Sequence, residues 1–240
     1  MSETPSPGDD SPLYGETWVY ESIVGAIPGL DLSDRTALVL QFVLFEALAV
    51  AVVAVFDRWQ ALAPGTAAIL VATAGSAFML DIGQRLRNAS IPAVYRQLLF
   101  STSFEVVLGV VGYATVLTVV FVYQPRHGQT LLETTLGPSV PLIAAFLFFM
   151  ILWDIAYRVG TGWWIALLAL WRAYATGVDP ATAATIRAID LRAAAFGLSQ
   201  LLLLPFVWEF RLLTALLLGH VAAVLVVVAA ARLRTGSQLD

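Results

Sequence analysis

Two pairs of charged residues have a spacing that suits ion pairing within a helix. Asp81 precedes Arg85 by four residues and Asp154 precedes Arg158 by the same interval, each time in the pattern Asp-Ile-x-x-Arg. Residues four apart lie on one face of an α-helix, so each carboxylate can pair with its arginine. Both pairs fall near the ends of apolar segments. They are predicted either to anchor the helix ends at the membrane surface or to form a polar cluster on a transport path.

Two glutamates lie deeper in apolar segments. Glu46 lies about ten residues, or 15 Å, inside one segment, and Glu105 lies about seven residues, or 10 Å, inside another. Neither has an arginine within helical reach, since Arg96 is nine residues from Glu105. A charged side chain near the bilayer centre costs about 2.5–3.5 kcal/mol. Both glutamates must therefore find hydrogen-bond partners on other helices, hold a proton, or face water on a path for an ion, proton or substrate.

A histidine occupies the middle of the last apolar segment. His220 follows Gly219, and the other histidine, His127, belongs to a polar loop. Haem ligation by two histidines is therefore not expected, and a hydrogen-bonded packing role is favoured over a ligand role. The candidate residues for a transport path or polar cluster are Glu46, Glu105, Asp81, Arg85, Asp154, Arg158 and His220.

The residue types that are missing exclude several kinds of chemistry. The chain has no cysteine, and all 13 basic residues are arginine. Thiolate nucleophiles, thiolate metal sites and lysine Schiff bases are thereby excluded. The sequence also contains no phosphate loop, zinc-protease motif or serine-hydrolase motif. We predict no catalytic residues, no metal site and no cofactor, and we expect neither enzymatic activity nor a nucleic-acid partner.

The composition indicates a protein embedded in lipid. Of 240 residues, 59% are hydrophobic and only 12% are charged, and the mean hydropathy is +0.82. Soluble chains carry about 25% charged residues, so this chain has too little polar surface to cover a soluble globule. The expected fold class is an all-α membrane protein, a bundle of six transmembrane helices.

Each expected span is a mostly apolar run of about 20 residues, the length that crosses a bilayer. Asp31, Ser33 and Asp34 are helix-start signals before the first span. The fifth span is expected to extend back to Pro180, and Pro205 is expected to kink it. The transmembrane domain is predicted at 36–234, with spans at about 37–56, 61–82, 98–123, 139–158, 193–210 and 211–231.

The segment 163–171 is apolar but too short to span a bilayer alone. We interpret it as part of a cytoplasmic helical segment, 159–192, that lies at the membrane surface after a break at 160–162. The chain ends are predicted to be a disordered acidic tail at 1–12, an interfacial helix with its connector at 13–35, and a short tail at 235–240.

The arginines predict the orientation of the spans. With six spans and both termini in the cytoplasm, cytoplasmic segments hold ten arginines and external segments hold three: Arg58, Arg126 and Arg211. Such an excess of positive charge on the cytoplasmic side is the usual rule. A seventh span at 163–179 would move four of the ten outside and remove the bias. We therefore predict a multi-pass cell-membrane protein with both termini inside.

The spans show weak internal similarity in pairs. Phe-Glu in the first and third spans is followed both times by Asp-Ile-x-x-Arg at the end of the next span. Three tandem hairpins would explain this pattern, and so would chance similarity in an apolar background. If the repeat is real, Glu46 and Glu105 converge in the cytoplasmic half of the bundle. Small residues at four-residue spacing also favour close helix packing, within one chain or between copies: Ala68, Ala72 and Ser76, and Gly219 and Ala223.

Two aromatic stretches resemble a known group of sequences. The stretch Tyr-Gly-Glu-Thr-Trp-Val-Tyr-Glu at 14–21 and the stretch from Trp-Asp to Trp-Trp at 153–164 resemble a haloarchaeal family of uncharacterised integral membrane proteins. The absence of lysine and the acidic isoelectric point of about 5.1 agree with such an origin. The resemblance implies a haloarchaeal cell-membrane protein and brings no activity with it.

Two functions of different classes remain. The first is a small transporter or channel for an ion, proton or small solute, favoured because Glu46 and Glu105 are expected in the same half of the bundle as the aspartates. The second is a non-catalytic scaffold or accessory subunit. It would bind a partner membrane protein, or form a homo-oligomer, through small residues and Trp163, Trp164 and Trp171. Membrane lipids are expected partners in both cases. A water-filled cavity lined by carboxylates would favour transport, and a dry bundle would favour the scaffold.

Overall fold

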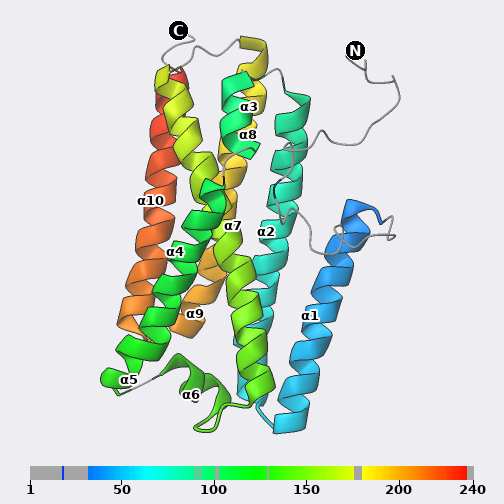
Figure 1. Cartoon of the computed structure of the whole chain (residues 1–240), viewed down its shortest axis with the longest axis vertical. Coiled ribbons are helices and arrows are strands. Elements are labelled where there is room, and N and C mark those ends of the chain that lie inside the picture. The colour runs from blue at the N-terminus through cyan, green and yellow to red at the C-terminus, as the bar shows by residue number, and fades with distance from the viewer. Residues whose placement is uncertain are drawn as a thin grey trace, which may run out of the picture.

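The structure is a computed structural model of the chain. It describes Trp18 and residues 32–89, 91, 93–100, 103–128, 130–175 and 180–236. These residues are almost entirely helical and include no strand, and the long helices form one bundle (Figure 1). The expected all-α class is therefore confirmed. Six helical stretches are long and apolar enough to cross a membrane: Asp34–Phe56, Trp59–Asn88, Ala93–Arg126, Leu142–Ala175, Ala184–Val207 and Arg211–Thr235.

Three of these stretches contain more than one helical element. The first three comprise α1 (Asp34–Phe56), the 3-10 turn η1 (Trp59–Ala61) with α2 (Leu62–Asn88), and then α3 (Ala93–Phe100), α4 (Phe104–Thr118), the π-helical turn η2 (Val119–Tyr123) and α5 (Gln124–Arg126). The short α6 (Leu131–Leu136) precedes the other three, which comprise α7 (Leu142–Ala175), α8 (Pro180–Ser199) with the 3-10 turn η3 (Gln200–Leu203) and α9 (Leu204–Val207), and α10 (Arg211–Gly236).

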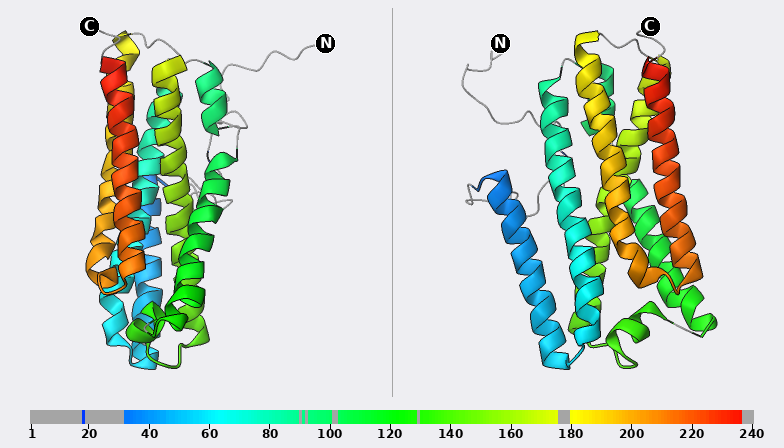
Figure 2. Two further views of the ribbon diagram at one scale, coloured as in Figure 1. Left: turned by 90° about the vertical axis from the view of Figure 1, so that its left-hand side faces the viewer. Right: turned by 180° about the vertical axis from the view of Figure 1, so that it is seen from behind.

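The central helix of the bundle is α7, which contacts α1, α2, α3, α4, α8 and α10. Consecutive spans pack as antiparallel neighbours, α1 on α2, α4 on α7 and α8 on α10 (Figure 2). Three tandem hairpins would give the same arrangement. By contrast, α1 lies at the edge of the bundle and most of its apolar side chains are exposed. Lipid tails are as apolar as these side chains, so a face turned to lipid needs no protein cover.

Local sequence sets several helix ends. Ser33 caps α1 as predicted, since its hydroxyl accepts a hydrogen bond from the backbone N–H of Thr36 at 3.3 Å. Pro180 is the first residue of α8, where its missing N–H is harmless. The irregularity expected at Pro205 takes the form of the 3-10 turn directly before α9, because proline cannot donate the next helical hydrogen bond.

One expectation for α7 is wrong. The predicted break at 160–162 is absent, and α7 runs without interruption for 34 residues through the segment 163–171. At 1.5 Å per residue this helix is about 51 Å long, while the hydrocarbon core of a bilayer is about 30 Å thick. The segment 163–171 therefore continues the central helix and is not a separate helix at the membrane surface.

The physical reason is a close crossing of α4 and α7. A Cβ atom on Gly160 would meet the backbone nitrogen of Gly109 and would lie 2.5 Å from the carbonyl oxygen of Glu105. A Cβ atom on Gly109 would lie 3.0 Å from the Cα atom of Tyr157. Glycine at both positions lets the two backbones touch, as small residues do in membrane bundles. Gly160 thus serves helix packing, and the burial around it outweighs the cost of about 1 kcal/mol for glycine within a helix.

Some expectations concern residues outside the described part of the chain. These are the acidic tail 1–12, the end of the other tail at 237–240, and the expected interfacial helix from 13 to 31 apart from Trp18. Trp18 is buried, its indole N–H donates to the carbonyl oxygen of Leu99 at 3.1 Å, and its ring centre lies 4.9 Å from that of Phe100. It therefore packs against the end of α3.

Candidate polar site in the helix bundle

The Asp154–Arg158 ion pair lies inside the bundle. Arg158 Nη2 donates to Asp154 Oδ1 at 2.6 Å, and Arg158 Nε donates to Asp154 Oδ2 at 3.2 Å. The side chains of Arg158 and Asp154 are 0% and 8% exposed. The predicted pair is therefore present, but it does not anchor a helix end. Because α7 continues to Ala175, the pair lies near the middle of this helix.

Gly75 of α2 makes room for the Arg158 side chain. A Cβ atom at Gly75 would collide with Arg158 Cδ and would lie 2.9 Å from the ring of Phe196 in α8. Arg158 Nη1 is directed at the sulfur atom of Met79, at 3.5 Å. The arginine is thus enclosed by α2, α7 and α8, and such enclosure requires a nearby opposite charge. Asp154 supplies that charge.

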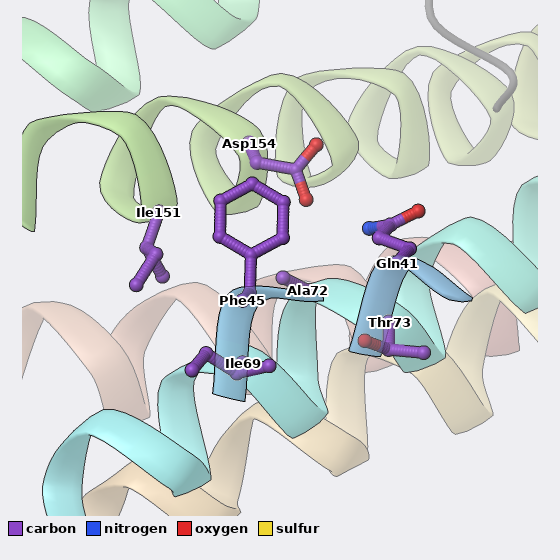
Figure 3. Close-up of a pocket in the computed structure, with 7 residues that line it drawn as sticks. All are labelled: Gln41, Phe45, Ile69, Ala72, Thr73, Ile151 and Asp154. Carbon is purple, nitrogen blue, oxygen red and sulfur yellow. The ribbon is translucent and has the colours of Figure 1, made fainter. Parts of the chain in front are cut away.

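A small cavity adjoins the Asp154 carboxylate between α1, α2 and α7 (Figure 3). Its volume is about 10 Å³, close to the minimum that holds one water molecule. Three of the lining residues are polar, namely Asp154, Gln41 and Thr73. Gln41 is buried, and its Oε1 accepts a hydrogen bond from the Ser76 hydroxyl at 3.1 Å. The other lining residues are Phe45, Ile69, Ala72 and Ile151.

Thr73 contributes an unsatisfied oxygen to this cavity. Its Oγ1 is buried and has no hydrogen-bond partner in the described part of the chain. A buried hydroxyl left in this state costs about 1–3 kcal/mol, and an occupant of the cavity could satisfy it. Carboxylate, amide and hydroxyl oxygens are suitable ligands for a water molecule or a small hard cation.

The Asp81–Arg85 pair is also formed, but it is partly exposed. Arg85 Nε donates to the two carboxylate oxygens of Asp81 at 3.1 and 3.0 Å, and each side chain is 40% exposed. Arg192 of α8 pairs with the same carboxylate, so Asp81 links α2 to α8. The two Asp-Ile-x-x-Arg patterns therefore form the same local pair in different environments.

The sequence did not predict a buried ion pair between α7 and α8. Arg172 Nη2 of α7 lies 3.2 Å from Asp190 Oδ2 of α8, and the side chain of each residue is 1% exposed. Arg172 Nη1 also donates to the hydroxyl of Tyr95 in α3 at 3.1 Å, and its guanidinium carbon lies 5.2 Å from the centre of the tyrosine ring. These two residues of the expected cytoplasmic helical segment, 159–192, are therefore buried between helices.

The two glutamates are held by different helix pairs. Glu46 of α1 faces α2, where the Thr66 hydroxyl donates to its Oε1 at 2.6 Å. Glu105 of α4 is 3% exposed and lies at the crossing with α7, beside Gly160. Figure 1 shows α1 at one edge of the bundle and α4 beyond α7. The main contacts of α1 are with α2 and those of α4 are with α7, so the two glutamates belong to different helix interfaces. In both residues Oε2 is buried without a hydrogen-bond partner among the described residues.

His220 takes part in a hydrogen bond between α7 and α10. The indole N–H of Trp163 donates to its Nδ1 at 2.7 Å, so the imidazole proton belongs on Nε2. Trp164 donates similarly to the carbonyl oxygen of Leu98 at 3.0 Å. Both tryptophans were expected to form a partner surface, but both make hydrogen bonds to neighbouring helices. In the described ranges, no group of three or more histidine, aspartate and glutamate side chains is placed to hold a metal ion.

The fold and these buried pairs together define a class of protein. An all-helical bundle with six helices long and apolar enough to cross a bilayer fits a multi-pass integral membrane protein. More particularly, residues 13–231 match the family of unknown function DUF7530, and the chain belongs to that family. No curated protein and no solved structure matches the chain. Membership covers nearly the whole bundle and assigns no activity to it.

Proposed function

We propose that this protein transports a proton or a small cation across the membrane and that Asp154 binds it. The observation that carries the proposal is the cavity beside the Asp154–Arg158 pair, with the unsatisfied Thr73 hydroxyl in its wall. Ionisable residues inside membrane bundles are costly and commonly mark ion or proton paths. A volume of about 10 Å³ leaves no space for an organic solute. Of the three substrates suggested by the sequence, a small solute is therefore dropped, and a proton or a small ion remains.

Arg158 makes the binding reversible in this mechanism. It holds the Asp154 carboxylate through two hydrogen bonds, so a cation that enters the cavity competes with the guanidinium for the same oxygens. Repulsion between the two positive charges weakens the ion pair, and release of the cation restores it. Transport requires such a balance, because a site that binds too tightly cannot release its ion.

The substitution Thr73→Val tests this proposal without a penalty to the fold. Valine has nearly the shape of threonine and removes a hydroxyl that has no partner, so we expect unchanged or slightly higher stability. If the hydroxyl helps to hold the ion, the flux of protons or sodium ions into proteoliposomes should fall about tenfold, the equivalent of 1.4 kcal/mol. A pH-sensitive dye and a sodium-sensitive dye inside the vesicles measure the two fluxes.

Two aspartate variants provide the comparison. Asp154→Asn removes the proposed binding group and should abolish the flux per folded molecule; the folded fraction is measured as well, because the change leaves the buried Arg158 charge unpaired. Asp190→Asn breaks a buried ion pair that does not line the cavity and should leave the flux per folded molecule unchanged. Equal fluxes for the wild type, Thr73→Val and Asp154→Asn, or a wild type with no flux of either ion, would refute transport through this site.

A second candidate function is a membrane scaffold or accessory subunit that binds a partner membrane protein or a second copy of the chain. The position of α1 favours it, because this edge helix leaves Val39, Val43 and Leu48 exposed along its length. A scaffold needs no ion path. The same proteoliposome experiment separates the two functions, since a scaffold should give no flux in the wild type and no difference between the aspartate variants.

We further propose that the protein resides in the cell membrane of a haloarchaeon with both termini in the cytoplasm. The absence of lysine and the acidic composition support the origin. Arg158 and Arg172 are buried in the bundle and no longer count as charges of a cytoplasmic segment. Eight arginines then remain on the cytoplasmic side against three outside, which still favours the predicted orientation.

Single cysteines test this orientation cleanly, because the natural chain has none. His127 follows α5 and Tyr174 lies in the last turn of α7, and both side chains are exposed. We expect a membrane-impermeant thiol reagent added to whole cells to label His127→Cys and to leave Tyr174→Cys unlabelled until the cells are lysed. Labelling of Tyr174→Cys in intact cells, with His127→Cys protected, would show the opposite orientation.

A further inference from the structure

An apolar groove of about 330 Å³ lies on the outside of the bundle where α4 passes into the π-helical turn η2. One wall comes from α4 and η2 and the other from α7, where Phe149 faces Phe121 with ring centres 5.6 Å apart. The residues that line the groove are Leu117, Thr118, Phe121, Val122 and Phe149.

The π-helical turn explains why this side of the helix opens. Val119 and Val120, the first two residues of the turn, are both buried in a cluster with Val53 and Leu213. The next residues are directed outward, and Phe121 is 45% exposed. A π-helical turn widens the helix locally and is frequently found at functional sites.

The chemistry of the groove suits a hydrocarbon chain. Its one hydroxyl, that of Thr118, is already bonded to the carbonyl oxygen of Ala114 at 2.8 Å. No polar group of the lining is therefore left to select a polar ligand. In a bundle that spans a bilayer, the material against such a groove is the acyl chain of a lipid.

The position of the groove along the helix places a charge at headgroup level. Arg126 follows Phe121 by five residues, a rise of about 7 Å. In the same stretch, the ring of Tyr123 stacks on that of His127 with centres 4.0 Å apart, and aromatic rings of this kind are enriched at the membrane–water interface. Arg126 is exposed and has no ion-pair partner within the described residues.

We propose that this groove is a binding site for an anionic phospholipid, with one acyl chain along Phe121 and Phe149 and the phosphate paired with Arg126. The apolar lining holds the chain, and the guanidinium selects the charged headgroup. This site is separate from the Asp154 cavity, so the proposal does not depend on transport.

Native mass spectrometry of the full chain in detergent, titrated with phosphatidylglycerol or phosphatidylcholine, tests the proposal. The wild type should retain one phosphatidylglycerol more tightly than phosphatidylcholine. Leu117→Trp fills the groove and should remove tight binding of both lipids. Arg126→Gln keeps the groove and should weaken phosphatidylglycerol binding about fivefold, as expected for one arginine near a lipid surface, with phosphatidylcholine unchanged.

Two control variants match these changes. Val111→Trp adds the same bulk to an exposed position of α4 outside the groove, and Arg35→Gln removes an exposed arginine at the start of α1. Both should bind phosphatidylglycerol as the wild type does. If Leu117→Trp does not fold, Arg126→Gln alone decides the question. Equal weakening by Arg126→Gln and Arg35→Gln would show general attraction of charge and would overturn the proposed site.

Discussion

Substitution of Gly160 by alanine is expected to lower the thermal unfolding midpoint in detergent by roughly 5–10 °C, the effect of a loss of 2–3 kcal/mol in a chain of this size. The added methyl group would meet the backbone nitrogen of Gly109 and the carbonyl oxygen of Glu105. Both are backbone atoms of α4 and cannot rotate away as a side chain can. The two helices must therefore separate, which weakens the interface that holds α4 to the central helix.

Two other glycines serve as controls for this prediction. Alanine at Gly162 would make only an ordinary contact with Phe196, at 3.5 Å, and alanine at Gly112 would meet nothing within 4 Å. Both changes replace glycine in a helix by a better helix former, worth about 1 kcal/mol, so both variants should be as stable as the wild type or more stable. A Gly160→Ala variant whose thermal unfolding midpoint equals those of Gly162→Ala and Gly112→Ala would contradict the close backbone crossing.

The features that the sequence predicted correctly depend on neighbours along the chain. Ser33 caps a helix through the N–H of a residue three positions later, and Asp81 and Asp154 each pair with an arginine four positions later. Such contacts require only that the segment is helical. The apolar runs made the helices themselves predictable, because each run is long enough to cross a bilayer.

The features that were wrong or missed depend on which helices become neighbours. Gly160 was interpreted as a helix break. It instead lets α7 pack against Gly109 of α4, and the sequence around Gly160 does not show which helix packs there. Arg172 and Asp190 lie on different helices, and their pairing depends on how α8 packs against α7. One signal was available: Asp190 directly follows the buried Ile189 in an apolar stretch, and a charge on an apolar helix face requires a partner.

For the same reason, only part of the candidate site could be predicted from the sequence. Asp154 and Arg158 could be selected from their spacing, but Gln41 and Thr73 are common residues in apolar spans and carry no pattern. They become relevant because α1 and α2 bring them to the cavity beside Asp154. The expected convergence of Glu46 and Glu105 relied on repeat symmetry, and α1 and α4 do not occupy equivalent places around α7.

A large loss of stability is expected from Asp190→Asn. The change leaves the Arg172 guanidinium charged in a position where its side chain is 1% exposed. Removal of one member of a buried ion pair costs about 3–5 kcal/mol. Asp81→Asn is the matched comparison, because its pairs with Arg85 and Arg192 are both partly exposed and such pairs contribute at most about 1 kcal/mol each. Thermal or denaturant unfolding in the same detergent measures both variants.

A double variant shows whether the charge, and not the shape of the side chain, is responsible. Asp190→Asn combined with Arg172→Met removes both charges and keeps similar volumes, and replacement of a whole buried pair by well-packed groups is often close to neutral. We expect the double variant to recover more than half of the stability lost by Asp190→Asn. The buried pair would have no such role if the double variant were as unstable as the single one, or if Asp190→Asn cost no more than Asp81→Asn. Recovery of stability in the double variant would show that the cost of Asp190→Asn comes from the unpaired Arg172 charge, and that the contact between α7 and α8 is stable without either charge.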